Sequence, residues 1–285
     1  MYYGLIILAV VMFGGTFAMQ DWNRKLRGNS LRISLETSLV GSIAGLTVLL
    51  LLNGDALDFT VFTVIIAILS AMNSIVFTFC SFQSLSHINL SLFSLFSMLG
   101  GMVLPFVQGI LFYREPLTIT KIVCLGLIVL ALMLTVTGEK KRRGTLYYVG
   151  IFVLNGMSGV LSKIYTSSSY AKTNAESFSI WIAICTVILS GAMLLLVVRK
   201  PAERQTYTVK ALALSAGNGS VNQIANYFLV IALAHVDASV QYPMVTGGVM
   251  IVSTIICFFG KQKPGAKDIL SVILAFIGML VRFLF

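Results

Sequence analysis

The sequence predicts an all-α integral membrane protein with ten transmembrane helices, arranged as two inverted five-helix repeats. Three observations lead to this fold class. Of the 285 residues, 58% are hydrophobic and only 11% are charged, whereas soluble domains are closer to half apolar and a quarter charged. Apolar runs of about 20 residues, the length needed to cross a hydrocarbon core of roughly 30 Å, recur along the whole chain. One segment of the first half also returns in the second, and an internal repeat decides a fold before other arguments do.

The repeat is clearest at the two histidines of the chain. His87-Ile-Asn-Leu-Ser91 returns as His235-Val-Asp-Ala-Ser239 in the second half. Asn89 and Asp237 are residue types that cap helix N-termini. We therefore interpret each histidine as part of a turn before a helix rather than as a proton carrier.

Ten spans are predicted, at 3–20, 31–53, 57–80, 88–112, 117–137, 145–163, 177–198, 209–232, 238–260 and 266–285. Five spans fall in each half, and an odd number makes the second half begin from the opposite side of the membrane. We expect two repeat domains, residues 1–138 and 145–285, related by a pseudo-two-fold axis in the membrane plane. Such repeats recur in secondary transporters, with the substrate site at the repeat interface near the midplane.

The spans differ in the features that support them. The first has no basic segment before it and no small-residue cleavage site after it, which indicates a retained helix rather than a signal peptide. The second, third, fifth, seventh and tenth rest chiefly on apolar length. The fourth and ninth carry Gly100-Gly101 and Gly247-Gly248, which suit close helix packing, with Pro105 and Pro243, which can kink a helix. The four cysteines lie inside apolar runs without metal-ligand spacing and are interpreted as core residues.

Basic residues indicate the orientation. The connections after the odd-numbered spans carry most of the 20 Lys and Arg residues, and the opposite side carries only Arg114, Lys121, Lys163, Lys172 and Arg282. The positive-inside rule then places the basic side in the cytoplasm and both termini outside. The membrane is expected to be the plasma (inner) membrane.

The eighth span is the most polar. Asn218, Asn222 and Asn226 stand at i, i+4 and i+8 and share one face, with Gln223 beside it. Amides are costly against lipid, so this face must point into the bundle, where it either binds helices together or binds substrate. We favour a cavity, and we expect the substrate contacts to be Asn155, Asn222, Gln223, Asn226 and Tyr242.

Acidic residues are absent from the middle of every span. Glu36, four residues after Arg32 in a spacing suited to an ion pair, and Asp21 are the carboxylates closest to such a position, and they are the candidates for ion coupling. An amide-rich, carboxylate-poor cavity favours a neutral or zwitterionic metabolite, such as an amino acid, over a lipophilic cation. We expect no cofactor, metal site or nucleic-acid partner. The expected partners are a small-molecule substrate and the lipid bilayer, with monomer and homodimer both open.

Three other functions are weighed. A phosphorylated or lipid-linked substrate would place its phosphate against Lys163 or Lys172. A multidrug exporter would turn attention to the two carboxylates, Glu36 and Asp21. A membrane enzyme is disfavoured, because the sequence contains neither a zinc-protease His-Glu pair motif, nor a nucleophile elbow with a partner histidine, nor paired intramembrane aspartates.

Two motifs suggest a family. The first begins at the end of the fourth span and reads Leu111-Phe-Tyr-Arg-Glu115-Pro-Leu117, with Lys121 and Gly126 after it. The second lies in the first span and reads Gly14-Gly15-Thr-Phe-Ala-Met-Gln20. With its ten short-looped spans, the chain resembles the ten-helix branch of the drug/metabolite transporter superfamily, the EamA-like transporters. The second repeat departs from the pattern, since Gln262 stands where glutamate is usual. The resemblance implies transport by alternating access, often export of amino acids or other metabolites, and it commonly implies cytoplasmic termini, the reverse of the Lys/Arg bias.

Overall fold

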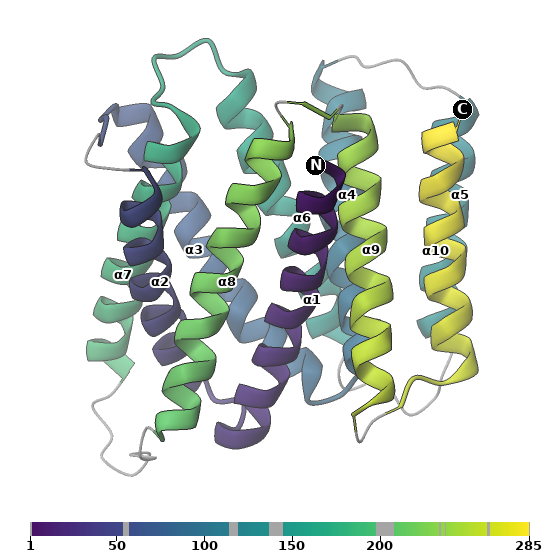
Figure 1. The fold of residues 1–285 in the computed structure, drawn as a ribbon, viewed down its shortest axis with the longest axis horizontal. Helices are drawn as coiled ribbons and strands as arrows, with labels where there is room; N and C mark the ends of the chain where they lie inside the picture. The colour runs from purple at the N-terminus through teal and green to yellow at the C-terminus, as the bar shows by residue number, and fades with distance from the viewer. Residues whose placement is uncertain are drawn as a thin grey trace.

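The computed structural model of the chain describes residues 2–53, 57–113, 119–136, 145–197, 208–233, 235–236, 238–260 and 263–284. Within these ranges the chain is helical and has no strand (Figure 1). The helices, in chain order, are α1 (Tyr2–Arg27), α2 (Leu31–Asn53), α3 (Val61–Leu85), α4 (Leu90–Tyr113), α5 (Ile119–Val136), α6 (Thr145–Ser167), α7 (Ala175–Val197), α8 (Val209–Leu233), α9 (Ala238–Phe258) and α10 (Ala266–Leu284). They follow the predicted spans in order, although α1 continues to Arg27 because its last turns find polar partners in α2 and α8.

Six of the described helices are long and apolar enough to cross a membrane, namely α1, α2, α3, α4, α6 and α7. The prediction of a helical membrane protein is confirmed at this level. That all ten helices cross the membrane stays a prediction. The first residues of α1 and the last residues of α10 lie in the upper half of Figure 1, as expected for an even number of antiparallel helices.

Eight of the described helices form a ring in which each packs on the next, in the order α1, α8, α2, α7, α3, α6, α4, α9 and back to α1. The helices α5 and α10 pack on each other outside this ring and adjoin α4 and α9 (Figure 1). Each contact along the ring joins a helix of the first half of the chain to a helix of the second half. Each helix of the ring therefore packs between two helices of the other half.

Glycines set the closest approaches in the ring, as small residues commonly do between membrane helices. A Cβ added at Gly100 of α4 would lie 2.0 Å from the carbonyl oxygen of Phe152 on α6, and one at Gly219 of α8 would lie 1.9 Å from the carbonyl oxygen of Gly41 on α2. Close approach also explains the Gly-Gly repeat. The interpretation of these glycines as packing residues is confirmed for Gly100, for Gly101 against α6, and for Gly248 against α1.

The repeated histidine segment forms the predicted turn in both halves. The amide N–H of His87 donates to the carbonyl of Ser84 at 2.9 Å, and that of His235 donates to the carbonyl of Ala232 at 3.0 Å. Asn89 caps α4, because its Oδ1 accepts from the N–H of Leu92 at 2.9 Å. The turn-and-cap interpretation is thus confirmed in the first half, whereas Asp237, the second cap, lies outside the described residues.

The core interpretation of the cysteines is confirmed where the structure describes them. Cys185 and Cys257 are buried and Cys80 is half-buried, all as free thiols. The side chain of Cys124 lies outside the described part of the chain.

Candidate functional site

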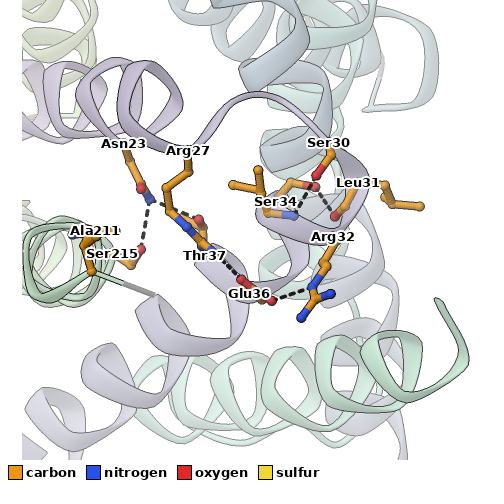
Figure 2. A network of polar contacts seen from close by, with 12 residues as sticks. Asn23, Arg27, Ser30, Leu31, Arg32, Ser34, Glu36, Thr37, Ala211 and Ser215 are labelled. Carbon is orange, nitrogen blue, oxygen red and sulfur yellow. Dashed lines mark hydrogen bonds and ion pairs between the residues drawn. The ribbon is translucent and has the colours of Figure 1, made fainter. Parts of the chain in front are cut away.

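A polar junction joins three consecutive helices of the ring at the end where α1 stops and α8 starts. Asn23 is 1% exposed, and its Nδ2 donates to Thr37 Oγ1 of α2 at 3.0 Å and to Ser215 Oγ of α8 at 2.9 Å (Figure 2). One amide group therefore uses both of its hydrogens to hold three helices together. We call this set, Asn23, Thr37 and Ser215, the α1–α2–α8 junction.

Charged residues surround this junction. Arg27 of α1 pairs through Nη2 with Glu36 Oε2 of α2, and Arg32 Nε donates to Glu36 Oε1 at 2.8 Å (Figure 2). The ion pair expected from the Arg32–Glu36 spacing is confirmed, while the pair with Arg27 was not predicted. Gly28, with φ of 94°, lets the chain turn between the two helices and so brings Arg27 back onto α2.

Both candidate coupling carboxylates lie at this end of the ring. Asp21 pairs with Arg24 at 2.8 Å and also with Lys25. Each carboxylate therefore has two cationic partners in the structure. A coupling role for Glu36 or Asp21 stays a prediction.

The amide face of α8 rises from the junction. Ser215 is fully buried, Asn222 is half-buried and Asn226 is exposed. Their spacing places them on one face, and Asn226 Nδ2 donates to the backbone oxygen of Asn222 at 2.9 Å and to its Oδ1 at 3.0 Å. Exposure thus increases along a single polar face with distance from the junction.

The other predicted contacts fall in different places. Gln223 lies against α2, where a Cβ added at Gly45 would be 3.1 Å from its Cγ. Asn155 of α6 donates to the carbonyl of Ser97 on α4 at 2.6 Å and is half-buried. The backbone of Tyr242 belongs to α9, but its side chain lies outside the described residues. The structure therefore groups Asn222 with Asn226 and separates both from Asn155.

Sequence reasoning placed Thr16 and Gln20 on a polar face of the first span but did not extend that face to Asn23. Thr16, Gln20 and Asn23 stand at i, i+4 and i+7, and they are 2%, 9% and 1% exposed. Among the residues that the structure describes, Gln20 Oε1 and Asn23 Oδ1 have no hydrogen-bond partner. The helical spacing of Thr16, Gln20 and Asn23 could have indicated this face, but the first span was predicted to end near Gln20, before Asn23.

A second polar junction lies at the opposite end of the ring, on α6, α3 and the segment before α7. The hydroxyl of Tyr165 donates to the carbonyl of Thr173 at 2.6 Å, and its oxygen lies 3.4 Å from Thr63 Oγ1. The Tyr165 ring stacks on Phe178 of α7 with centroids 3.8 Å apart. This set, Tyr165, Thr63 and Thr173, is the α6–α3–α7 junction, and it is uncharged.

The lysines of the phosphate alternative lie near this second junction. Lys172 is exposed, and its Nζ donates to the carbonyls of Thr166 and, at 3.0 Å, Ser168. Lys163 of α6 is half-buried. The described residues include no group of three or more His, Cys, Asp or Glu side chains that could hold a metal ion.

Comparison with known proteins gives no identification. No protein-family model matches the chain, and no curated protein matches it. Part of the motif that carries the family resemblance, including Glu115 and Leu117, lies outside the described residues, as does Gln262.

Proposed function

We propose that the chain is a secondary transporter, most simply an exporter, that moves a small neutral or zwitterionic solute across the plasma (inner) membrane by alternating access. The observation that carries the proposal is the amide face of α8. Asn222 and Asn226 are large polar groups on a bundle helix, and their exposure increases away from the α1–α2–α8 junction. Amides facing hydrocarbon are costly, so the exposed end of this face lines a water-filled pathway inside the ring.

The order of helices around the ring supports an inverted repeat. Exchanging the two halves turns the α1–α8 contact into α6–α3, α4–α6 into α9–α1, and α2–α8 into α7–α3. The contacts α2–α7, α4–α9 and α5–α10 map onto themselves. A pseudo-two-fold axis in the membrane plane has this effect, and it would place the substrate at the interface of the halves.

Two aromatic stacks support the same exchange. Tyr2, at the start of α1, stacks on His235 with ring centroids 4.0 Å apart. Tyr147, in the first turn of α6, faces His87 with centroids 6.5 Å apart. Each stack joins the first helix of one half to the turn before the fourth helix of the other half. Their equivalence favours the ten-helix EamA-like architecture that the motifs suggested.

The solute class follows from the groups present. The described face of α8 carries amides and hydroxyls, and the two carboxylates near it, Glu36 and Asp21, are each paired with cations. Such a wall can hydrogen-bond a neutral or zwitterionic solute, whereas a lipophilic cation would lack an unpaired counter-charge. The multidrug alternative is therefore less well supported.

The test is transport by the purified protein in proteoliposomes loaded with labelled amino acids, sugars, nucleosides or cationic drugs. We expect one neutral or zwitterionic class to be transported and the Asn222→Ala variant to lose most of that activity. The control is Asn174→Ala, which removes an exposed amide that caps α7 by accepting from the N–H of Ser177 at 2.7 Å, and which should transport as the wild-type protein does. Transport of cationic drugs alone, or equal transport by the wild-type protein and Asn222→Ala, would contradict the proposal.

A further inference from the structure

The starting observation is a pair of buried oxygens on α1. Gln20 Oε1 and Asn23 Oδ1 lie on one face of the helix, on side chains that are 9% and 1% exposed, and neither accepts a hydrogen bond from any described residue. An unpaired buried acceptor is unfavourable, and each such group in a native structure calls for an explanation. The orientation of Asn23 is fixed, because both hydrogens of its Nδ2 are used by Thr37 and Ser215.

Asn23 lies beside the start of the amide face of α8, and the spacing along the two helices gives the level of Gln20 on it. Asn23 bonds Ser215, near the end of α1 and the start of α8, and the two helices pack in opposite directions (Figure 1). Both helices rise about 1.5 Å per residue. Gln20 precedes Asn23 by three residues, and the helices are antiparallel, so Gln20 lies level with the third residue after Ser215, which is Asn218. Asn222 follows Asn218 by about one helical turn.

The amide of Asn222 offers the opposite chemistry. Its Oδ1 already accepts from Asn226 Nδ2 at 3.0 Å. The remaining polar group of this side chain is Nδ2, which carries two N–H donors. The buried face of α1 thus carries acceptors, and the face of α8 that begins at Ser215 carries a donor about one helical turn farther along.

We propose that Gln20 and Asn23 accept hydrogen bonds from the ammonium group of a zwitterionic solute, while Asn222 Nδ2 donates to its carboxylate. An ammonium group has three donors and suits two carboxamide oxygens, and a carboxylate accepts only. A zwitterion carries both groups and has no net charge, so uncharged amides can bind it without a counter-ion. The Arg27 guanidinium, one turn beyond Asn23, is paired with Glu36. This inference rests on the proposed transport function and specifies which atoms select the substrate.

The experiment measures binding to the purified full-length protein by calorimetry. The probes are the standard amino acids, and then the deaminated and decarboxylated analogues of the tightest-binding one. The variants are Gln20→Leu and Asn222→Leu. The matched control is Gln108→Leu, because Gln108 is also 9% exposed with an unpartnered Oε1 among the described residues, but it belongs to α4, which packs on α6 and α9 rather than on α8.

The expected result is a crossed pattern. Gln20→Leu weakens binding of the amino acid and of its decarboxylated amine by about tenfold or more and leaves the deaminated acid unchanged. Asn222→Leu weakens the amino acid and the deaminated acid and leaves the amine unchanged. Gln108→Leu changes none of the three. Ligand-free Gln20→Leu should unfold at no lower temperature than the wild-type protein, because it loses an unpartnered acceptor, and this shows that the variant is folded.

Two results would overturn the inference. The first is an equal loss for all three probes in both variants, or no loss in either. The second is the absence of amino-acid binding in a protein that binds and transports another neutral solute, which would leave the transport function standing. Failure of every solute class in proteoliposomes would instead remove the proposed function itself.

Discussion

Gly219 gives a direct test of how closely α8 approaches α2. A Cβ added there would lie 1.9 Å from the carbonyl oxygen of Gly41 and 2.5 Å from its carbonyl carbon, whereas ordinary contact begins at 3.4 Å. Both atoms are backbone, so no side-chain rotation relieves the clash, and the two helices must separate. Overpacking costs about 1–3 kcal/mol, while alanine gains up to about 1 kcal/mol of helix propensity over glycine. With that gain subtracted, we expect Gly219→Ala to lower the free energy of unfolding by up to about 2 kcal/mol.

The control is Gly191→Ala on α7, where an added Cβ meets nothing within 4 Å. The same substitution should there raise the free energy of unfolding by up to about 1 kcal/mol, from helix propensity alone. Both variants are measured by equilibrium unfolding in mixed micelles, followed by tryptophan fluorescence. If Gly219→Ala is as stable as Gly191→Ala, then α2 and α8 do not meet at Gly41, and the placement of the amide face of α8 is wrong.

Three further predictions follow from the junctions and from the charge bias. Tyr165→Phe removes the hydroxyl that bonds the segment before α7 and should lower stability by about 1 kcal/mol, measured in the same micelle titration; an unchanged midpoint would contradict the α6–α3–α7 junction. Glu36→Gln leaves Arg27 without its carboxylate and should lower the free energy of unfolding by about 1–3 kcal/mol. Because the pair is buried, adding about 1 M salt to the wild-type protein should not lower its stability by a similar amount, and an equal effect of salt would contradict a buried pair. In a cysteine-free background, Lys25→Cys should react with a membrane-impermeant maleimide only in inverted vesicles, and Tyr170→Cys only in intact cells, because the basic side is expected to be cytoplasmic; the reverse pattern would support the orientation common in the family instead.

Local spacing accounts for what the sequence could predict. The turn at His87, the cap by Asn89 and the Arg32–Glu36 pair each involve residues no more than four positions apart, so the chain itself brings them together. The packing role of Gly100 and Gly248 followed from residue size. These features need no knowledge of which helices become neighbours.

The polar junctions depend on helix order around the ring, which the sequence does not contain. Asn23 and Ser215 are 192 positions apart and meet because α8 inserts between α1 and α2. The same reason explains Asn155, which shares the residue type of the α8 amides but lies on α6 and uses its Nδ2 to bind α4. A polar face predicts that a helix has a polar partner, and only the tertiary arrangement decides whether that partner is another helix or a solute.

The alternating origin of ring neighbours bears on how the proposed transport would work. Because each ring contact joins the two halves, a rotation of one half against the other changes the whole ring at once. The hydrogen bonds of the α1–α2–α8 junction and the α6–α3–α7 junction lie at opposite ends of that ring and occupy equivalent positions under exchange of the halves. Rotation in one sense would stretch the first set, and rotation in the opposite sense would stretch the second.

The two sets differ in chemistry, since ion pairs of Glu36 with Arg27 and Arg32 flank the first, whereas the second is built from hydroxyl and carbonyl groups. The two open states should therefore differ in energy, and Glu36→Gln should shift their populations toward the state in which the α1–α2–α8 junction is open.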